Sequence, residues 1–380
     1  MEFNLNKKQE EIVKIAREFA SKELLPKVCE RDAAGEYPVE TWKKMGELGI
    51  LGLPYPKEYG GTECGYMGYV LALQEIAKVD ASVAIAYSIS TSVCCGGIYN
   101  YGTEEQKKKY LKPLLVGDAI GAFGLTESEA GSDASNIKTV AEDKGDYYLL
   151  NGTKIFTTNG PICKYYFVIA STDPRKGVKG LSAFIVDTSW EGVLVGTIED
   201  KMGLREAQVS QMHFNNVKVP KENLLGEEGK GFKYAMASLD GGRIGVAAQS
   251  LGIAKGAFDI AYKYIQDREQ FGKPLYKNQY IAFRMAELKT KIAAAELLLY
   301  KAAILHDEHK PFGEAAAMAK LTCSNLAMEV TTEAVQFLGG NGYMKGYHVE
   351  RMMRDAKITQ IYEGTNEIQK LVISNAMFQK

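Results

Sequence analysis

The sequence lacks an excess of either charge and lacks a long uninterrupted apolar run. Its 46 lysine and arginine residues nearly balance 47 aspartate and glutamate residues, which gives a net charge of −1 at pH 7. Such a balance provides no electrostatic attraction to nucleic acid or to an anionic membrane. The apolar segment KIAAAELLLYKAAIL is interrupted by Glu296 and Lys301, and the charged N-terminus MEFNLNKKQEEIVKIAREFA has no signal core. We therefore expect a cytoplasmic protein with no nucleic-acid partner and no membrane partner.

Disulfide and metal patterns are also missing. The six cysteines show no CxxC and no paired spacing, which predicts reduced thiols in a chain of this length. Among the four histidines only His306 and His309 lie close together, and no third ligand stands at the spacing of a metal site. We expect neither disulfides nor a bound metal ion.

A Rossmann-type glycine turn is absent as well, since such a turn must follow a strand and open a helix. The best candidate, GGNGYMKG at residues 339–346, follows a long helical pattern instead. We expect its glycines to cap that helix. If the protein binds a dinucleotide, another arrangement must hold it.

What the sequence does contain is a change of residue pattern along the chain. A chain of 380 residues is too long for one ordinary core, so more than one domain is expected. Helical periodicity comes first, short segments rich in aromatic and β-branched residues follow, and long helical patterns then return. We expect a mainly α fold with a central β domain: helices over 1–117, an antiparallel β domain over 118–228 and a helical bundle over 229–380. The expected strands are 147–159, 165–171, 181–187 and 209–219, and the expected long helices are about 233–266, 278–306 and 313–338.

Two polar segments of the β region could carry chemistry, although each also has a structural explanation. The segment GAFGLTESEAGSDAS, residues 121–135, follows the first expected strand and concentrates hydroxyls at Thr126, Ser128 and Ser132. Such a loop could face a flat polar ring or a phosphate, or could be a plain surface turn. In KIFTTNG, Phe156 by itself fits the core.

Two further polar segments belong to the long helix that follows. LDGGRIG places Asp240 and Arg243 near the start of that helix, where a structural ion pair is the default explanation. DREQFGKPL ends the helix with Arg268 beside Phe271. An arginine there could bind a phosphate bidentately or could satisfy the terminal carbonyls.

The segment TQIYEGTNEIQK, residues 359–370, raises a separate question about Glu363. A glutamate is rarely buried without a partner, yet this one follows Ile361 and Tyr362 and precedes a glycine. Thr365 followed by Glu367 resembles the polar opening of a last helix, so Glu363 could simply favour the positive end of that helix. The position alone favours this helix-start reading.

Taken in order, the motifs resemble those of one family. AFGLTESEAGSD, NGTKIFTTNG, KMGLRE, GRIGVAAQSLGIAKGA, DREQFGKPL, FLGGNGY and MRDAKITQIYEGTNEIQ are similar to the acyl-CoA dehydrogenase family, nearest the short-chain or butyryl-CoA dehydrogenases. The similarity runs from about residue 5 to residue 378. It implies the family fold of an N-terminal helical domain, an antiparallel β domain and a C-terminal four-helix bundle.

The resemblance also implies a reaction. Family members remove a proton from the carbon next to a thioester carbonyl while the next carbon gives a hydride to the flavin of FAD, leaving a 2-enoyl-CoA. Glu363 occupies the position of the family's catalytic base. Desolvation must raise the pKa of such a carboxylate, and the carbonyl must be hydrogen-bonded. On this reading Ile361 and Tyr362 keep the site dry, and Gly364 lets the substrate approach.

Other motif residues match family positions that contact FAD or the CoA portion, and the contacts near Arg268 come partly from a neighbouring subunit. The implied FAD contacts are Phe123, Leu125, Thr126, Ser132, Phe156, Thr157, Thr158, Arg268, Gln270, Phe271, Asn278, Gln279, Gln336, Phe337, Gly339, Gly340, Thr365, Asn366 and Glu367. The implied substrate contacts are Ser132, Asp240, Arg243 and Gly364.

The chain departs from the family pattern in its flavin loop and in LREAQVSQM, which is more polar than usual. The usual Glu-Pro-Gly or Glu-Pro-Asn of the loop is Glu127, Ser128 and Glu129 here, so the stiffening proline is replaced and a carboxylate is added. The shape of this loop or its contacts with a partner could therefore differ.

Three further features bear on the substrate. Tyr99 and Tyr101 in STSVCCGGIYNYG stand near a region that can bound the acyl pocket, which predicts a short or compact acyl group. Isovaleryl and long-chain relatives draw their base from the segment around Asp240, but the matching position here is Gly242. Residues 82–100 contain no arginine, which disfavours a glutaryl-type substrate.

The resemblance thus predicts an FAD-dependent acyl-CoA dehydrogenase that passes electrons to an electron-transfer flavoprotein, assembled as a homotetramer, a dimer of dimers. An alternative is an enoyl-CoA reductase that runs the reverse reaction in an anaerobic electron-bifurcating complex. A third possibility is a non-catalytic flavin-binding assembly subunit, against which the intact Glu363 argues.

Overall fold

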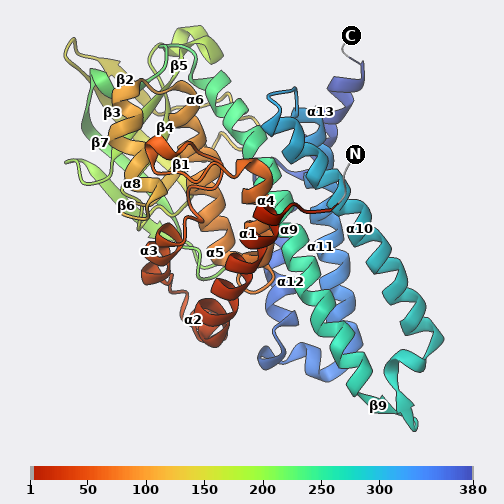
Figure 1. The fold of residues 1–380 in the computed structure, drawn as a ribbon. Coiled ribbons are helices and arrows are strands. Elements are labelled where there is room, and N and C mark those ends of the chain that lie inside the picture. The colour runs from red at the N-terminus through yellow and green to blue at the C-terminus, as the bar shows by residue number, and fades with distance from the viewer. Residues whose placement is uncertain (1–3, 379–380) are drawn as a thin grey trace.

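The computed structural model describes residues 4–378, which form a group of short helices, a sheet and a long helical bundle (Figure 1). The short helices contact both the sheet and the bundle. The order along the chain is the expected α, β, α order. The short helices are α1 (Lys7–Phe19), α2 (Val28–Ala34), α3 (Val39–Glu47), α4 (Gly65–Ala77), α5 (Ala81–Ser88), α6 (Gly96–Tyr101), α7 (Glu104–Gln106) and α8 (Lys112–Leu115).

A continuous helix from Ala81 to Tyr101 forms the centre of this group. Asp80 begins it by accepting the Ser82 and Val83 amides, and a π-helical segment, Ile89–Cys95, joins α5 to α6. By length and composition it is the one helix of the described residues that could span a membrane, but 94% of its most apolar window is buried inside the protein. It contacts β1 and α9 and serves as a core helix. This helix, rather than the segment around Glu296, is the most apolar of the chain.

The sheet has the strand order β6-β7-β3-β2-β4-β5-β8, with β1 paired to β4. β4 and β5 are continuous apolar runs because both of their faces are buried, whereas β3 and β7 alternate buried residues with partly or fully exposed ones over much of their length. Most pairs are antiparallel as expected, but β1 and β2 run parallel to β4, so the sheet is mixed. The strands are β1 (Gly121–Gly124), β2 (Val140–Asp143), β3 (Tyr147–Thr158), β4 (Tyr165–Ser171), β5 (Leu181–Asp187), β6 (Val193–Ile198), β7 (Val209–Pro220) and β8 (Leu224–Leu225).

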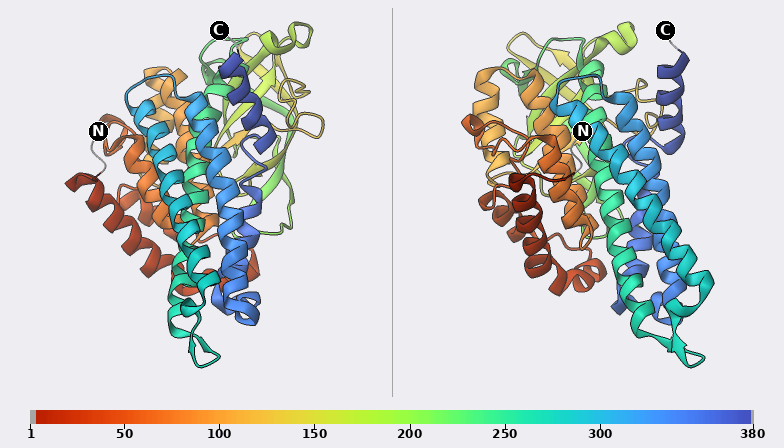
Figure 2. Two further views of the ribbon diagram at one scale, coloured as in Figure 1. Left: turned by 90° about the vertical axis from the view of Figure 1, so that its right-hand side faces the viewer. Right: turned by 45° about the vertical axis from the view of Figure 1, so that its right-hand side comes forward.

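The bundle is built on α9 (Gly231–Asp267), which has 37 residues and is about 55 Å long at about 1.5 Å per residue. α10 (Gln279–Asp307) and α11 (Gly313–Leu338) pack beside it, and α12 (Val349–Ile358) and α13 (Asn366–Phe378) pack on α11. A hairpin of β9 (Glu269–Gln270) and β10 (Lys273–Pro274) follows α9. It projects beyond the rest of the chain at the far end of the bundle (Figure 2).

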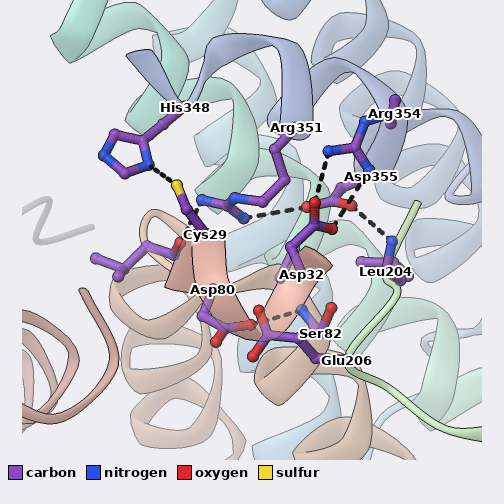
Figure 3. A network of polar contacts seen from close by, with 12 residues as sticks. Cys29, Asp32, Asp80, Ser82, Leu204, Glu206, His348, Arg351, Arg354 and Asp355 are labelled. Atoms are coloured by element: carbon purple, nitrogen blue, oxygen red, sulfur yellow. Dashed lines mark hydrogen bonds and ion pairs between the residues drawn. The ribbon is translucent and has the colours of Figure 1, made fainter. Parts of the chain in front are cut away.

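An ionic network fixes α12 to the other two parts of the chain (Figure 3). Asp355 accepts the Leu204 amide at 2.6 Å and the Arg351 guanidinium at 3.1 Å. Arg354 donates to Asp32 in α2 at 2.8 Å. Because α12 leads directly into the loop of Glu363, this network anchors the N-terminal end of that loop.

A second part of the network involves the unusual polar segment noted in the sequence. Arg31 pairs with Asp80 at 2.8 Å and with Glu206 at 2.5 Å. Burial and the neighbouring Asp80 carboxylate raise the pKa of Glu206, while its contact with Arg31 opposes that rise. The extra polarity of this segment therefore serves the junction between α2 and the sheet.

Candidate active site

The loop that carries Glu363 joins α12 to α13. Thr365 Oγ1 accepts the Ile368 amide at 3.3 Å, and α13 begins at Asn366, so the helix-start reading applies to Thr365. Glu363 lies outside the helix with a φ of 54°. This left-handed conformation is uncommon for glutamate and is typical of strained functional loops.

Glu363 is half-buried, and one oxygen of its carboxylate is enclosed by the protein. This Oε2 atom is buried and has no hydrogen-bond partner among the described residues. Burial raises the pKa of this carboxyl to about 7, while the positive charges of Arg243 and Lys320 pull the pKa down. A carboxyl that titrates near neutrality can accept a proton at physiological pH, as a general base must.

Gly242 in α9 makes room for this carboxylate. A Cβ atom at position 242 would stand 2.5 Å from Glu363 Oε2 and 3.1 Å from Val93 Cγ2. A larger residue there would have to displace the carboxylate. The glycine at position 242 and the glutamate at position 363 are therefore linked by geometry.

Tyrosine hydroxyls border the same stretch of α9. A Cβ at Gly241 would lie 2.7 Å from the Tyr66 hydroxyl oxygen, and one at Gly245 would lie 2.4 Å from that of Tyr69. Burial raises the pKa of both tyrosines, and the charge of Glu363 raises it further. Both tyrosines therefore stay neutral, and they close off the space along α9 beside Glu363.

The two residues before Glu363 differ in position. The Tyr362 hydroxyl donates to Gln249 Oε1, and Gln249 is fully buried in α9. Ile361 is 47% exposed. Of the two side chains expected to keep the site dry, only Tyr362 turns inward.

Tyr99 and Tyr101 pack elsewhere. Tyr99 meets Tyr55 edge-on at a ring distance of 5.5 Å, and Tyr101 stacks on Tyr234 at 4.0 Å. These contacts belong to a second apolar cluster under the sheet. That Tyr99 and Tyr101 bound the acyl pocket therefore stays a prediction, and the tyrosines that lie beside the Glu363 stretch of α9 are Tyr66 and Tyr69.

Asp240 and Arg243 form the expected ion pair one turn apart in α9. Arg243 is buried, and its Nε atom has no hydrogen-bond partner among the described residues. Its charge reaches Glu363, as the lowering of the Glu363 pKa indicates. The pair is thus structural and also part of the electrostatic environment of Glu363.

The loop after β1 is closed by hydrogen bonds in place of the missing proline. The main chains of Glu127 and Ala130 exchange two hydrogen bonds of 3.1 Å, and the Glu127 carboxylate accepts Lys154 Nζ at 2.7 Å. Ser128 and Glu129 are exposed. The departure from the family pattern therefore leaves a well-anchored turn with an added surface carboxylate. β1 itself occupies the first four residues of the segment that was expected to follow a strand.

Phe156 does not belong to the core, where the sequence alone would place it. It is 63% exposed, has a φ of 54°, and lies where the pairing register of β3 with β7 shifts. Ile155 donates its amide to the Thr126 carbonyl at 2.9 Å, which brings the loop after β1 beside this bulge. A bulge of this kind re-aims a side chain, here an apolar ring held at the surface.

The neighbours of Phe156 divide between surface and interior. The Thr157 hydroxyl is buried against that of Tyr166 at 2.7 Å, and Leu125 is also buried. Phe123 packs on Phe167 with a ring distance of 5.0 Å. The side chains that remain accessible are Thr126 and Thr158, both half-buried, and Ser132, which is exposed.

The predicted residues after α9 lie at the far end of the bundle. Phe271 is fully exposed with a φ of 53°, which is an unusual state for a large apolar side chain. Asn278 Oδ1 accepts the Tyr280 amide at 3.1 Å and begins α10. The residues of this group that the structure leaves exposed are Arg268, Gln270, Phe271, Asn278 and Gln279.

The glycines after α11 lie at the same far end. Gly339 has a φ of 58° and ends α11, so the expected capping role is present. Gly339 and Gly340 are exposed with open space around their Cβ positions, Gln336 is exposed, and Phe337 is buried.

The two groups of predicted residues are therefore well separated. Gly242, which touches Glu363, and Arg268 are about 40 Å apart along α9 at about 1.5 Å per residue. One dinucleotide cannot extend over this distance. The structure brings Gly242 and Arg243 of α9 close to Glu363 and leaves the hairpin group apart from it.

Sequence reasoning missed Lys320. It is fully buried in α11, and its Nζ donates to the Gly364 carbonyl at 2.8 Å and to Asn366 Oδ1 at 3.0 Å. The available signal was a single lysine in the otherwise small and apolar stretch EAAAMAKLTC. Asn366 is held inside the protein by this contact and by Ser324 and Asn325.

Comparison with known proteins identifies the class. Models of the acyl-CoA dehydrogenase N-terminal, middle and C-terminal domains match residues 6–118, 122–217 and 229–378. A short-chain specific acyl-CoA dehydrogenase of Clostridium acetobutylicum is 49% identical over 100% of both chains. The caffeyl-CoA reductase-Etf complex subunit CarC of Acetobacterium woodii is 47% identical over 97% of this chain and 98% of its own. A solved chain from a study of the electron transferring flavoprotein of Acidaminococcus fermentans and flavin-based electron bifurcation has a TM-score of 0.99 and 52% identity, with full coverage of both chains.

These matches define a flavin-dependent oxidoreductase of three domains. The chain belongs to the acyl-CoA dehydrogenase family. Its cofactor is FAD, as in the rest of the family. The residues present suit that group, because the exposed ring of Phe156 stands on a strained bulge beside Thr126, which offers an apolar face and hydroxyl groups to a flat heterocycle.

Proposed function

We propose that the protein catalyses the α,β-dehydrogenation of a short or compact acyl-CoA and that Glu363 is the base. The observation that carries this proposal is the buried, unpartnered Oε2 atom of Glu363, whose carboxyl has a pKa raised to about 7. A structural carboxylate at this depth would have a hydrogen-bond partner. A base that must receive a proton from a bound substrate keeps its acceptor atom free.

The chain's own groups each have a part in this reaction. Glu363 Oε2 takes the proton from the α-carbon of the thioester. Tyr362, Tyr66 and Tyr69 exclude water from the carboxylate and keep its affinity for the proton high. Gly364, with a φ of 85°, leaves the approach to the carboxylate unobstructed. FAD, when bound, supplies the acceptor for the hydride that leaves the β-carbon.

We assign the FAD site to two chains. Thr126, Phe156 and Thr158 suit the flavin ring of the same chain, because the half-buried Thr126 in the loop after β1 lies beside the end of β3 that carries the exposed Phe156 and the half-buried Thr158. Arg268, Phe271 and Gln279 suit the diphosphate and adenine part of a neighbour's FAD, since about 40 Å of α9 separates them from the Glu363 end of their own chain. Assembly as a homotetramer, a dimer of dimers, would cover the exposed ring of Phe271. Thr157 and Asn366 support the site indirectly by holding the backbone around it, because their side chains face inward.

We assign the end of the acyl pocket to Tyr66, Tyr69 and Val93. They stand against the glycine stretch of α9 that touches Glu363. Large aromatic side chains in this place favour short or compact acyl groups. The domain boundaries at residues 117 and 228 and a cytoplasmic location complete the proposal.

An electron-transfer flavoprotein is the proposed electron partner. The similarity to CarC, whose name includes a reductase-Etf complex, also favours a second candidate function: enoyl-CoA reduction in an electron-bifurcating complex. One site catalyses both directions of the reaction. Anaerobic titration with a panel of acyl-CoA and enoyl-CoA esters, followed by flavin bleaching or reoxidation, distinguishes the preferred substrate and direction. A protein that binds flavin but reacts with no ester of the panel would instead be an assembly subunit.

The substitution Glu363→Gln tests the base. The amide is nearly isosteric, so we expect the fold, FAD and acyl-CoA binding to persist. Loss of a positioned general base costs on the order of 10²–10⁴ in rate. The measurement is anaerobic single-turnover flavin reduction by the best acyl-CoA. A variant within about tenfold of the parent, which corresponds to about 1.4 kcal/mol, would refute the assignment.

A further inference from the structure

Lys320 is a buried lysine whose hydrogen-bond partners are neutral. It is fully buried in α11 and donates to the Gly364 carbonyl at 2.8 Å and to the Asn366 amide oxygen at 3.0 Å. Transfer of an ammonium ion from water into a protein costs several kcal/mol unless charged partners or hydrogen bonds compensate. Neither acceptor carries a charge, so fold stability alone gives little reason for a lysine at this position.

Both acceptors lie in the loop that carries Glu363. Asn366 is fixed in turn by Ser324 Oγ at 3.0 Å and by Asn325 Oδ1 at 2.9 Å, both from α11. Gln369 Nε2 donates to the Glu363 carbonyl at 3.2 Å and to the Gly364 carbonyl at 2.8 Å. A left-handed backbone at a glutamate is strained and persists only where its surroundings hold it.

We propose that Lys320 is a positioning residue for the base: it anchors the Glu363 loop to α11, and its charge stabilises the carboxylate form of Glu363. This inference rests on the proposed role of Glu363. It assigns a function to a residue that acts on the reaction through the loop of Glu363.

The charges around the pair agree with this role. The groups that act on Lys320 are Glu363 in the loop, Arg243 in α9 and Glu367 in α13. Burial lowers the pKa of Lys320 to about 7, and the two carboxylates oppose that lowering. The titratable groups that face Glu363 are Arg243, Lys320, Tyr66, Tyr69 and Tyr362.

The direction of the effect follows from these charges. Lys320 lowers the pKa of Glu363, so removal of its charge leaves burial opposed by Arg243 alone and raises that pKa. A base with a higher pKa is deprotonated only at higher pH. The acid limb of the pH–rate profile therefore moves toward alkaline pH when Lys320 loses its charge.

The test compares Lys320→Met with a matched control, Lys255→Met. Lys255 lies in the same bundle and also donates to side-chain oxygens, Gln74 Oε1 at 3.0 Å and Glu296, but it does not contact the loop. Lys320→Arg keeps the charge and the donor groups. The measurements are anaerobic flavin reduction from pH 5.5 to 9 and hydrogen exchange of the amides of residues 363–366.

For Lys320→Met we expect at least a tenfold slower flavin reduction at pH 7, an acid limb moved up by about one pH unit and faster exchange in the loop. Lys255→Met should leave the limb and the loop exchange unchanged, and Lys320→Arg should restore the limb. An unchanged limb in folded Lys320→Met would overturn the inference. If Lys320→Met cannot be isolated with FAD, Lys320→Gln, which keeps an N–H donor but carries no charge, must produce the same alkaline shift, or the inference fails.

The parallel Glu363→Gln measurement distinguishes a failure of the role of Lys320 from a failure of the role of Glu363. Loss of chemistry in Glu363→Gln with no shift in Lys320→Met refutes only the role of Lys320. Retained chemistry in Glu363→Gln refutes the base itself.

Discussion

The two ends of α9 differ in how their unusual residues are supported. At the Glu363 end, a strained backbone is surrounded by Gly242, Tyr66, Tyr362 and Lys320 of the same chain. At the hairpin end, Phe271 has an equally unusual backbone but no cover, since it is fully exposed. The Glu363 end is thus enclosed by residues of its own chain, whereas the hairpin end leaves an apolar ring uncovered, which fits the proposal that a neighbouring chain completes a site there.

The largest expected effect after loss of the base itself comes from crowding the Glu363 end of α9. Gly242→Ala places a Cβ 2.5 Å from Glu363 Oε2, so the carboxylate must move. We expect flavin reduction to fall by about 10²-fold, since a small misplacement of a reacting group costs this much, while FAD stays bound. Gly346→Ala, which meets open space, is the control. Equal rates for both variants would show that the carboxylate is not confined by α9.

The next effect concerns the hairpin end of α9. Phe271→Asp places a charge where a neighbouring chain is expected to pack, so assembly and FAD retention should weaken together. Sedimentation and the flavin-to-protein ratio measure the two properties on one sample. A variant monomer that still holds FAD tightly would show that the hairpin serves no neighbour. Val178→Asp, a surface apolar residue of the sheet region, controls for added charge.

A smaller effect is expected from the tyrosines. Tyr66→Ala removes a ring beside Gly241 and should shift the preferred acyl chain toward longer esters by about tenfold in relative kcat/KM. The matched variant Tyr99→Ala, in the separate apolar cluster, should leave the preference unchanged. A longer preferred chain in Tyr99→Ala alone would return the pocket to the position expected from the sequence.

The smallest effect is a pH dependence that separates the two ends. Glu363 must be deprotonated to accept a proton, and burial raises its pKa to about 7, so the reaction rate should increase as pH rises through about 7. FAD retention depends on the hairpin and should stay level over the same range. A rate that is already maximal at pH 5.5 would contradict the burial of the base.

The sequence predicted the elements well and their surroundings less well. The strands 165–171 and 181–187 and the helix 313–338 were expected with the bounds that the structure has, because each is a strongly patterned run between clear turn residues. The edge strand β6 was not expected, since its residues are largely exposed and lack alternation.

The site illustrates the same limit. Motifs predicted Glu363, Phe156 and Phe271, but nothing in the letters indicates that all three have a positive φ. Left-handed backbone at these residues follows from a bulge, a hairpin and a loop anchored from α11, which are contacts distant in sequence. Lys320 and Tyr66 were missed for the same reason, because their importance depends on which loop and helix the fold places against them.

The length of α9 has a genetic consequence. Under the proposed two-chain site, the base and the hairpin of one chain belong to different composite sites, so a chain that carries Glu363→Gln and a chain that carries Phe271→Asp damage different parts. When the two are produced together, a mixed pair contains one site with an intact base from the second chain and an intact hairpin from the first. Two inactive alleles should therefore complement each other, and recovered activity should follow the fraction of mixed assemblies.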